Sequence, residues 1–298
     1  MRIKEFEIES LYGKYSFKSQ LDEKVNIIVG NNGTFKSTII GIIRYVANYG
    51  EVPISDYKTA RLLLRNEIVV RSKSTTFKSN NNDVQVTLPT REITLNGEKL
   101  STKEYVKQLK LNYISTFDIK DKDIDVQQTL LDKRLVQLQS DYGYYLNGLQ
   151  KQFASYLIKQ GSVTKELYDK IYTRKTLFEN LVNGAFKETG KAIDNESEKL
   201  RFIIDGKTSI EASQLSSGEK QLLIILLTVL LEDGQEYVLM MDEPEISLHI
   251  SWQYELLNWI LELNPNVQLI LTTHSPSIFS DGWGDKAIYM EDITTVAK

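Results

Sequence analysis

Short apolar runs that end in polar residues recur along the chain and predict the buried strands of a parallel sheet. The clearest run, residues 237–241, ends in Asp242 and Glu243. Residues 25–29 run into a glycine-containing loop, and residues 267–271 run into a Thr-Thr-His-Ser segment. Ligands of open α/β sheets bind beyond the carboxyl ends of the strands. We therefore expect the functional site at these polar strand ends.

Helical periodicity marks a different part of the chain. Between residues 127 and 200, apolar residues recur three or four positions apart with charged residues between them. They include Leu130, Leu131, Leu135, Leu138, Tyr145, Leu146, Leu149 and Phe153. We expect two to four helices forming a lobe, without a heptad repeat long enough for an extended coiled coil. Further helices are predicted over residues 39–49, 102–109, 222–231 and 251–263.

Strand patterns fill most of the remaining sequence. The first 29 residues predict strands over 3–8, 15–21 and 25–29, and residues 50–126 read as a strand-rich insertion. The insertion strands are expected at 67–71, 84–88 and 92–95, with an Asn-Gly hairpin turn at 96–97 and a polar loop over 72–83. Residues 112–118 are expected to form a core strand with a polar end. A strand pair at 200–204 and 208–212 and a closing strand at 287–290 complete the pattern.

Three segments follow from these patterns. Residues 1–126 contain the first part of an α/β core with its insertion, residues 127–200 the helical lobe, and residues 201–298 the second part of the core. Composition agrees with a globular protein, because 41% of the 298 residues are apolar. We expect no membrane span, since no apolar run approaches the roughly 20 residues that cross a bilayer. With no cysteine, we expect a cytoplasmic protein without a disulfide framework or a thiolate metal site. The net charge of -4 gives no overall basic field for nucleic acid, although a local basic face is compatible with it.

The loop after residues 25–29 has the chemistry of a phosphate-binding loop. Strand, glycine-containing loop, Lys-Ser and helix follow one another, and such a loop cradles phosphates with main-chain N–H groups. Lys36 would reach the β and γ phosphates, and Ser37 would bind Mg²⁺. Phe35 stands where this motif has its second glycine, so its side chain must point away from the phosphates. The candidate nucleotide-binding residues here are Asn31, Asn32, Gly33, Thr34, Phe35, Lys36, Ser37 and Thr38.

Two later segments add candidate residues, each with a plainer alternative. The second stretch that could bind an anion is Ser216, Ser217, Gly218 and Glu219, where serines open an apolar helix. An ordinary N-cap would give the same local pattern. Asp242 and Glu243 could equally be a strand leaving the core through a polar turn, and a lone histidine such as His274 is usually structural.

Taken together, five motifs in order resemble those of the ABC-type ATPase family. The sequence GNNGTFKST (30–38) resembles Walker A, LSSGEKQ (215–221) the signature motif, and YVLMMDEPE (237–245) Walker B. SLH (247–249) stands at the D-loop position, and TTHS (272–275) resembles the switch-histidine strand. The resemblance implies a P-loop NTPase fold of the α/β class, with a mixed or parallel core sheet, a β-rich insertion and a helical lobe.

The resemblance also implies roles for individual residues. ATP would be the nucleotide and Mg²⁺ the metal, held by Ser37 and Asp242. Lys36, Glu243 and His274 would be catalytic, with Glu243 polarising the attacking water and His274 sensing the γ-phosphate. Ser217 and Gly218 would act on the nucleotide of a second subunit, so a homodimer or higher homo-oligomer is expected.

The branch of the family is a separate question. The wide separation of Walker A from the signature, and DEPEISLH after Walker B, resemble non-transport members: DNA-repair and chromosome-maintenance heads, and phage-defence ATPases of the overcoming-lysogenisation-defect, Septu and PARIS-like types. Because the chain stops after its last core strand, we expect a stand-alone ATPase that regulates a separate nuclease or toxin. A DNA-binding repair ATPase is the alternative, which leaves nucleic acid open as a partner, and a transporter subunit is third. No glutamine marks a Q-loop; Ser115, Thr116 or Asp118 would have to replace it.

Overall fold

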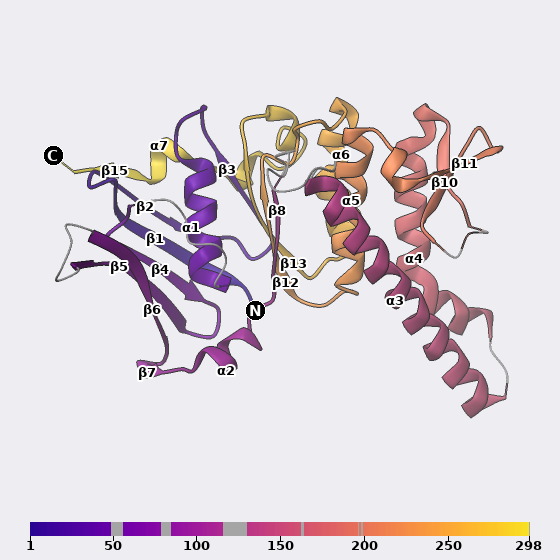
Figure 1. The fold of residues 1–298 in the computed structure, drawn as a ribbon, viewed down its shortest axis with the longest axis horizontal. Helices are drawn as coiled ribbons and strands as arrows, with labels where there is room; N and C mark the ends of the chain where they lie inside the picture. The colour runs from indigo at the N-terminus through magenta and orange to yellow at the C-terminus, as the bar shows by residue number, and fades with distance from the viewer. Residues whose placement is uncertain are drawn as a thin grey trace. The chain divides into compact units, whose positions relative to one another are not determined.

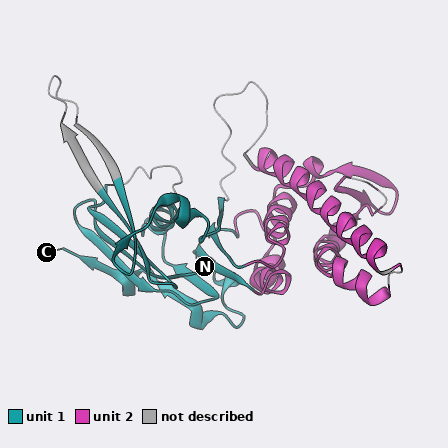
Figure 2. Ribbon diagram, turned by 90° about the horizontal axis from the view of Figure 1, so that it is seen from below, with its two compact units in different colours: residues 1–115, 236–244, 266–298 teal, residues 116–235, 245–265 magenta. Residues whose placement is uncertain are grey.

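The computed structural model describes residues 1–48, 56–78, 85–115, 130–161, 164–195, 197 and 199–297. They fall into two compact units that alternate along the chain. The first unit comprises residues 1–115, 236–244 and 266–298, and the second comprises residues 116–235 and 245–265 (Figure 2). The described part of the predicted helical lobe lies in the second unit, together with the helix that follows the signature-like motif.

A five-stranded parallel sheet forms the centre of the first unit. Its order is β14-β3-β13-β12-β8, and every neighbouring pair is parallel. The strands are β3 (Val25–Val29), β8 (Leu111–Ser115), β12 (Tyr237–Asp242), β13 (Val267–Thr273) and β14 (Ala287–Tyr289). All residues of β12 and β13 are buried, which explains why their sequences are mostly apolar. The predicted parallel core is confirmed.

The first unit also contains a seven-stranded antiparallel sheet, ordered β15-β2-β1-β4-β5-β6-β7. Its strands are β1 (Ile3–Leu11), β2 (Tyr15–Gln20), β4 (Thr59–Leu64), β5 (Ile68–Lys78), β6 (Gln85–Leu95), β7 (Glu98–Lys99) and β15 (Thr294–Val296). Helix α1 (Lys36–Asn48) contacts β4 and β5 of this sheet and β12 and β13 of the parallel sheet (Figure 1). The apolar face of α1 therefore joins both sheets in one core.

Two expectations for the insertion were wrong. The polar tract predicted as a loop from residue 72 continues β5 to Lys78, while residues 79–84 lie outside the described part of the chain. Ser72 is fully buried and its hydroxyl lies 2.9 Å from the Tyr57 hydroxyl, so a polar residue occupies an inward position of this strand. The strands predicted at 84–88 and 92–95 are one strand, β6, which pairs with β5 along its whole length.

The short elements of the insertion agree with the sequence pattern. Asn96 and Gly97 have positive φ and form the predicted turn between β6 and β7. Helix α2 (Thr102–Val106) begins at a capping box formed by Ser101 and Glu104. The helix is shorter than expected. Of the predicted 112–118 strand, β8 covers the first part, and residues 116–118 lie outside the described ranges.

The second unit is mainly helical. Its helices are α3 (Leu130–Gln160), α4 (Lys165–Phe186), α5 (Ser217–Leu231) and α6 (Ile250–Leu263). A three-stranded antiparallel sheet accompanies them, ordered β11-β10-β9, with β9 (Lys191–Ile193), β10 (Arg201–Ile204) and β11 (Thr208–Glu211). The structure therefore confirms the predicted strand pair and adds β9. Helix α7 (Met290–Ile293) and four short helical turns complete the described elements: η1 (Lys187–Thr189), η2 (Ala212–Gln214), η3 (Pro276–Ile278) and η4 (Gly284–Lys286). None of the described helices is long and apolar enough to cross a membrane.

Candidate active site

The loop between β3 and α1 has the backbone expected of a phosphate-binding loop. Helix α1 starts at Lys36, and the N–H groups of residues 35–38 meet no hydrogen-bond acceptor among the described residues. The first N–H groups of a helix carry partial positive charge and bind anions. The loop thus presents several free donors directly beside the side chains of Lys36 and Ser37.

Lys36 is held beneath this loop. Its side chain is only 4% exposed, and its Nζ donates to the main-chain oxygens of Gly30 (2.8 Å) and Asn31 (3.2 Å). The same Nζ lies 3.4 Å from the Glu243 carboxylate. Lys36 therefore joins the two ends of the loop to the carboxyl end of β12.

The side-chain oxygens of Ser37 and Asp242 lie side by side. The Ser37 hydroxyl donates to Asp242 Oδ1 over 3.0 Å, and Asp242 is the last residue of β12. Burial raises the pKa of Asp242, while hydrogen bonds from Thr272 and Ser37 oppose that rise. A hard cation beside these two oxygens would compensate the buried charge, and oxygen ligands are those that Mg²⁺ prefers. The residues present therefore fit the metal that the motif implies.

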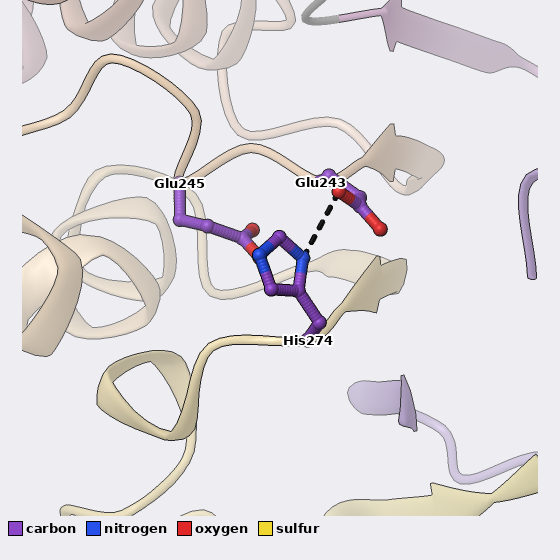
Figure 3. A group of neighbouring side chains, drawn as sticks. All are labelled: Glu243, Glu245 and His274. Atoms are coloured by element: carbon purple, nitrogen blue, oxygen red, sulfur yellow. Dashed lines mark ion pairs between the residues drawn. The ribbon is translucent and has the colours of Figure 1, made fainter. Parts of the chain in front are cut away.

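Glu243 and His274 contact each other at the same end of the sheet. His274 Nδ1 lies 3.0 Å from Glu243 Oε2, and the contact joins the residue after β12 to the residue after β13 (Figure 3). The main chain of Glu243 is held in place by Thr272. The Glu243 N–H donates to the Thr272 main-chain oxygen (3.0 Å) and to the Thr272 hydroxyl (3.2 Å). Glu243 itself has a left-handed backbone, with a φ of 47°. Glu245, also drawn in Figure 3, belongs to the second unit.

Thr272 belongs to this site, although no role for it is predicted from the sequence. It is fully buried, and its hydroxyl donates a short hydrogen bond to Asp242 Oδ1. The parallel register places Thr272 directly opposite Asp242 on the neighbouring strand. Its position in the Thr-Thr-His-Ser segment was the only sequence signal, and a threonine in a strand is too common to suggest a role.

The structure brings five of the candidate residues together in the first unit: Lys36, Ser37, Asp242, Glu243 and His274. The other loop residues surround them, with Asn32 and Gly33 exposed and the Thr34 hydroxyl donating to the Asn31 main-chain oxygen over 2.7 Å. Thr38 is half-buried in the first turn of α1. Such a set of donors, oxygen ligands and a paired carboxylate can bind a polyphosphate with a divalent cation and position a water for phosphoryl transfer.

The signature-like residues lie in the second unit. Ser216 is the N-cap of α5, and with Glu219 it forms a capping box. Glu219 is 1% exposed and receives hydrogen bonds from Lys191 Nζ (2.8 and 2.9 Å) and from Thr189 (2.8 Å). Ser217 is exposed at the start of the helix, and Gly218 is half-buried. The capping reading of this motif is therefore correct for Ser216, and it leaves the Ser217 side chain open to a ligand.

Comparison with known proteins agrees with the architecture. Residues 25–280 match the family model described as "AAA domain, putative AbiEii toxin, Type IV TA system". The match covers most of the chain, and the protein therefore belongs to this AAA-domain ATPase family.

Two curated proteins are similar to the chain. It is 27% identical over 183 residues to the Retron Ec83 probable ATPase of Escherichia coli, a match that covers 54% of this chain and 31% of that protein. It is 22% identical over 303 residues to the Septu protein PtuA of Bacillus thuringiensis, covering 92% of this chain and 72% of that protein. The chain thus spans about a third of the retron protein and most of the Septu protein.

Solved structures share the fold. An SMC head bound to the C-terminal winged-helix domain of ScpA has a TM-score of 0.60 at 15% identity, covering 100% of this chain and 97% of that one. The SMC head of Thermotoga maritima has a TM-score of 0.52, also at 15% identity, covering 100% of this chain and 98% of that one. The predicted fold, which the chain shares with SMC heads, and the resemblance to defence ATPases are confirmed.

Proposed function

We propose that this protein hydrolyses ATP, closes as a homodimer around the nucleotide, and regulates a separate effector, a nuclease or toxin, in an antiviral defence system. The observation that supports the chemistry best is the convergence of Lys36, Ser37, Asp242, Glu243 and His274 at one end of the parallel sheet. The similarity to a retron ATPase and to a Septu protein supports the defence role.

Each of these residues has a separate role in the proposed phosphoryl transfer. Lys36 and the N–H groups of residues 35–38 bind the phosphates and stabilise the charge that develops there. Ser37 and Asp242 would hold Mg²⁺, which neutralises charge on the phosphate oxygens. Glu243, held by His274 and by its main-chain bonds to Thr272, orients a water and accepts its proton. Ser217 and Gly218 complete the site of the second subunit.

The experiment that tests this proposal compares wild type with Glu243→Gln. We measure ATP turnover, and the mass in solution with and without ATP and Mg²⁺. The amide keeps the shape of Glu243 but cannot accept a proton, so turnover should fall at least 100-fold. The mutant should retain ATP and persist as a dimer or a higher assembly. Glu98→Gln, an exposed position on β7, is the matched control and should leave both measurements unchanged.

Two results would contradict parts of the proposal. Unchanged turnover in Glu243→Gln would remove Glu243 from the catalytic role. A wild-type protein that stays monomeric with ATP bound would contradict the proposed homodimer. Regulation of an effector is tested separately, by co-expressing the protein with the product of the neighbouring gene and measuring toxicity with wild type and with Glu243→Gln.

Direct binding to DNA is the second candidate function, and the resemblance of LSSGEKQ and DEPEISLH to the motifs of DNA-repair ATPases favours it. The net charge of -4 gives no overall attraction to phosphate backbones, so a DNA site would have to be a local basic surface. Such a site would show duplex affinity that falls steeply with salt concentration. Affinity that is weak and independent of ATP would exclude this role.

A further inference from the structure

Phe35 occupies the position of the phosphate-binding loop where a glycine is usual. It directly precedes Lys36 and has a φ of 67°, in the left-handed region that favours glycine. A side chain in this backbone conformation is disfavoured unless its contacts compensate for the strain. The reason for a phenylalanine here must therefore be found in what its ring touches.

The ring of Phe35 packs into a group of aromatic side chains from the β1–β2 hairpin. The centroid of its ring lies 5.0 Å from that of Tyr15, 5.9 Å from Tyr12 and 6.2 Å from Phe17. All three distances are in the range in which aromatic pairs attract, and all three pairs are tilted or edge-to-face. The ring therefore points away from the main-chain N–H groups of the loop and into the antiparallel sheet.

The hairpin that supplies these rings is itself firmly held. Phe17 is 1% exposed, and Tyr15 and Phe17 stand two residues apart on β2, so their side chains share one face. β2 pairs with β1 on one side and with β15 on the other. Phe35 thus ties the loop to a strand inside a seven-stranded sheet.

We propose that Phe35 is a positioning residue that anchors the phosphate-binding loop to the β1–β2 hairpin and sets the backbone from which Lys36 and Ser37 begin. Because the contacts fix the left-handed turn immediately before Lys36, the N–H groups of α1 are oriented before the nucleotide arrives. Preorganisation of this kind lowers the cost of binding. The inference rests on the proposed binding of ATP, and it explains how the loop works without its second glycine.

The alternative is that Phe35 only fills space in the core. The two roles differ in what a substitution changes: loss of a core residue lowers stability, whereas loss of an anchor weakens nucleotide binding at temperatures at which the protein is folded. Phe35→Gly separates them most sharply, because glycine relieves the left-handed strain and restores the usual loop residue while removing the ring.

The test measures ATP affinity with a fluorescent ATP analogue, KM and kcat for ATP, and the melting temperature. The variants are Phe35→Gly, Phe35→Ala and Phe35→Leu. We expect about 10-fold weaker binding and a higher KM for Phe35→Gly and Phe35→Ala, equivalent to about 1.4 kcal/mol, with kcat changed much less. Phe35→Leu, which keeps apolar volume, should recover part of the affinity.

Two further variants make the result specific. Leu95→Ala removes a partly buried residue that packs against the same core from β6, so it should lower the melting temperature without changing ATP affinity. Tyr15→Ala should weaken ATP binding. Adding it to Phe35→Ala should have little further effect, because each substitution alone already removes the same Tyr15–Phe35 contact. If Phe35→Ala fails to fold, Phe35→Leu and Tyr15→Ala carry the test.

The outcomes distinguish the inference from the proposed function. Wild-type affinity in Phe35→Gly, or additive effects of Tyr15→Ala and Phe35→Ala, would overturn the anchoring role while leaving ATP binding intact. A wild-type protein that binds no nucleotide would instead overturn the proposed function, and the anchoring role with it.

Discussion

Asp242 shows how a single buried carboxylate links stability to function. It is 2% exposed, and burial raises its pKa above the ordinary 3.8. Because the folded protein holds this proton more tightly than the unfolded chain, the free energy of unfolding falls as pH rises from the ordinary carboxyl range through the raised pKa. Above that range the cost of the buried charge is fully present.

We therefore predict that Asp242→Asn stabilises the protein in the absence of nucleotide and Mg²⁺. The amide oxygen can still accept from Ser37 and Thr272, and the free energy of unfolding at neutral pH should rise by about 1 kcal/mol. The gain should shrink in acid, where the wild-type carboxyl is protonated. Denaturant unfolding at several pH values measures it, and Asp285→Asn, at an exposed carboxylate, is the control. A less stable Asp242→Asn protein would contradict the interpretation.

Thr272 acts at the same scale, through one hydroxyl group. It donates to Asp242 and accepts from the Glu243 N–H, so it holds both acidic residues. Thr272→Val keeps the shape and removes the hydroxyl, leaving a buried N–H with one acceptor fewer. We predict that the free energy of unfolding falls by about 1–2 kcal/mol. The Mg²⁺ concentration needed for half-maximal ATP turnover should rise about 10-fold. Thr228→Val, which removes a buried hydroxyl from α5, is the control for stability alone.

At the scale of elements, the signature-like helix and the turn after Walker B depend on a glycine. A Cβ built on Gly218 would lie 2.2 Å from the main-chain oxygen of Ser247, so the two backbones touch. Ser247 has a φ of 71°, which makes this turn difficult to rebuild around a side chain. The contact therefore couples the start of α5 to the D-loop-like segment at residues 247–249.

Gly218→Ala should therefore disturb the turn at residues 245–249 and leave the phosphate-binding loop unaffected. We predict a loss of about 2 kcal/mol in stability and a large loss of ATP turnover, with ATP affinity retained. Gly143→Ala within α3, where an added Cβ meets nothing within 4 Å, is the control and should be neutral or stabilising. Normal turnover in Gly218→Ala would show that the turn moves at no functional cost.

The N-terminus of α5 is tied to the β9 region by a buried ion pair. Burial acts to raise the pKa of Glu219, but hydrogen bonds from Lys191, from the Ser216 N–H and from Thr189 outweigh it, so the pKa is lowered. A lowered carboxyl pKa means that the stability this group contributes is present above its ordinary value of 4.5 and is lost as pH falls through the folded value. The helix start is therefore most secure at neutral pH.

Removing the cation should expose the cost of this buried charge. We predict that Lys191→Met lowers the free energy of unfolding by about 3 kcal/mol at neutral pH and by less near pH 4, where Glu219 becomes protonated in the variant. Lys207→Met, at an exposed position between β10 and β11, is the matched control. Equal losses at both pH values would show that Lys191 contributes packing and not charge.

Elements also show what could be predicted from the sequence and what could not. Buried parallel strands such as β12 and β13 can be predicted from the sequence, because burial on both faces makes them mostly apolar. The length of β5 was missed, since its polar residues are stabilised by main-chain pairing with β6 and not by an apolar face. The place of Thr272 could not be predicted either, because it depends on the register between two strands 30 residues apart.

At the scale of the whole molecule, the motifs are divided between the two compact units. Lys36 and Glu243 belong to the first unit, and Ser217 and Gly218 to the second. The motif resemblance implies that Ser217 and Gly218 serve the nucleotide of a second copy, and a complete site within one copy is the alternative. In a two-fold dimer each site would combine the phosphate-binding loop of one copy with the signature segment of the other.

Mixing two inactive variants decides between these arrangements. Lys36→Ala disables phosphate binding in its own copy, and Ser217→Arg blocks the signature segment. If sites are shared, a dimer of one Lys36→Ala and one Ser217→Arg copy contains one intact site, because the intact loop faces the intact signature segment. An equal mixture should then recover up to about a quarter of wild-type ATP turnover, since half of the dimers are mixed and each has one working site of two.

If each copy forms its own site, the mixture stays as inactive as either variant alone. Tagged pull-down must confirm that mixed dimers form, and an inactive mixture that contains them would contradict shared sites that work independently. Recovery of turnover in the mixture would place the signature segment opposite its partner's loop and make subunit closure a step of the ATP cycle.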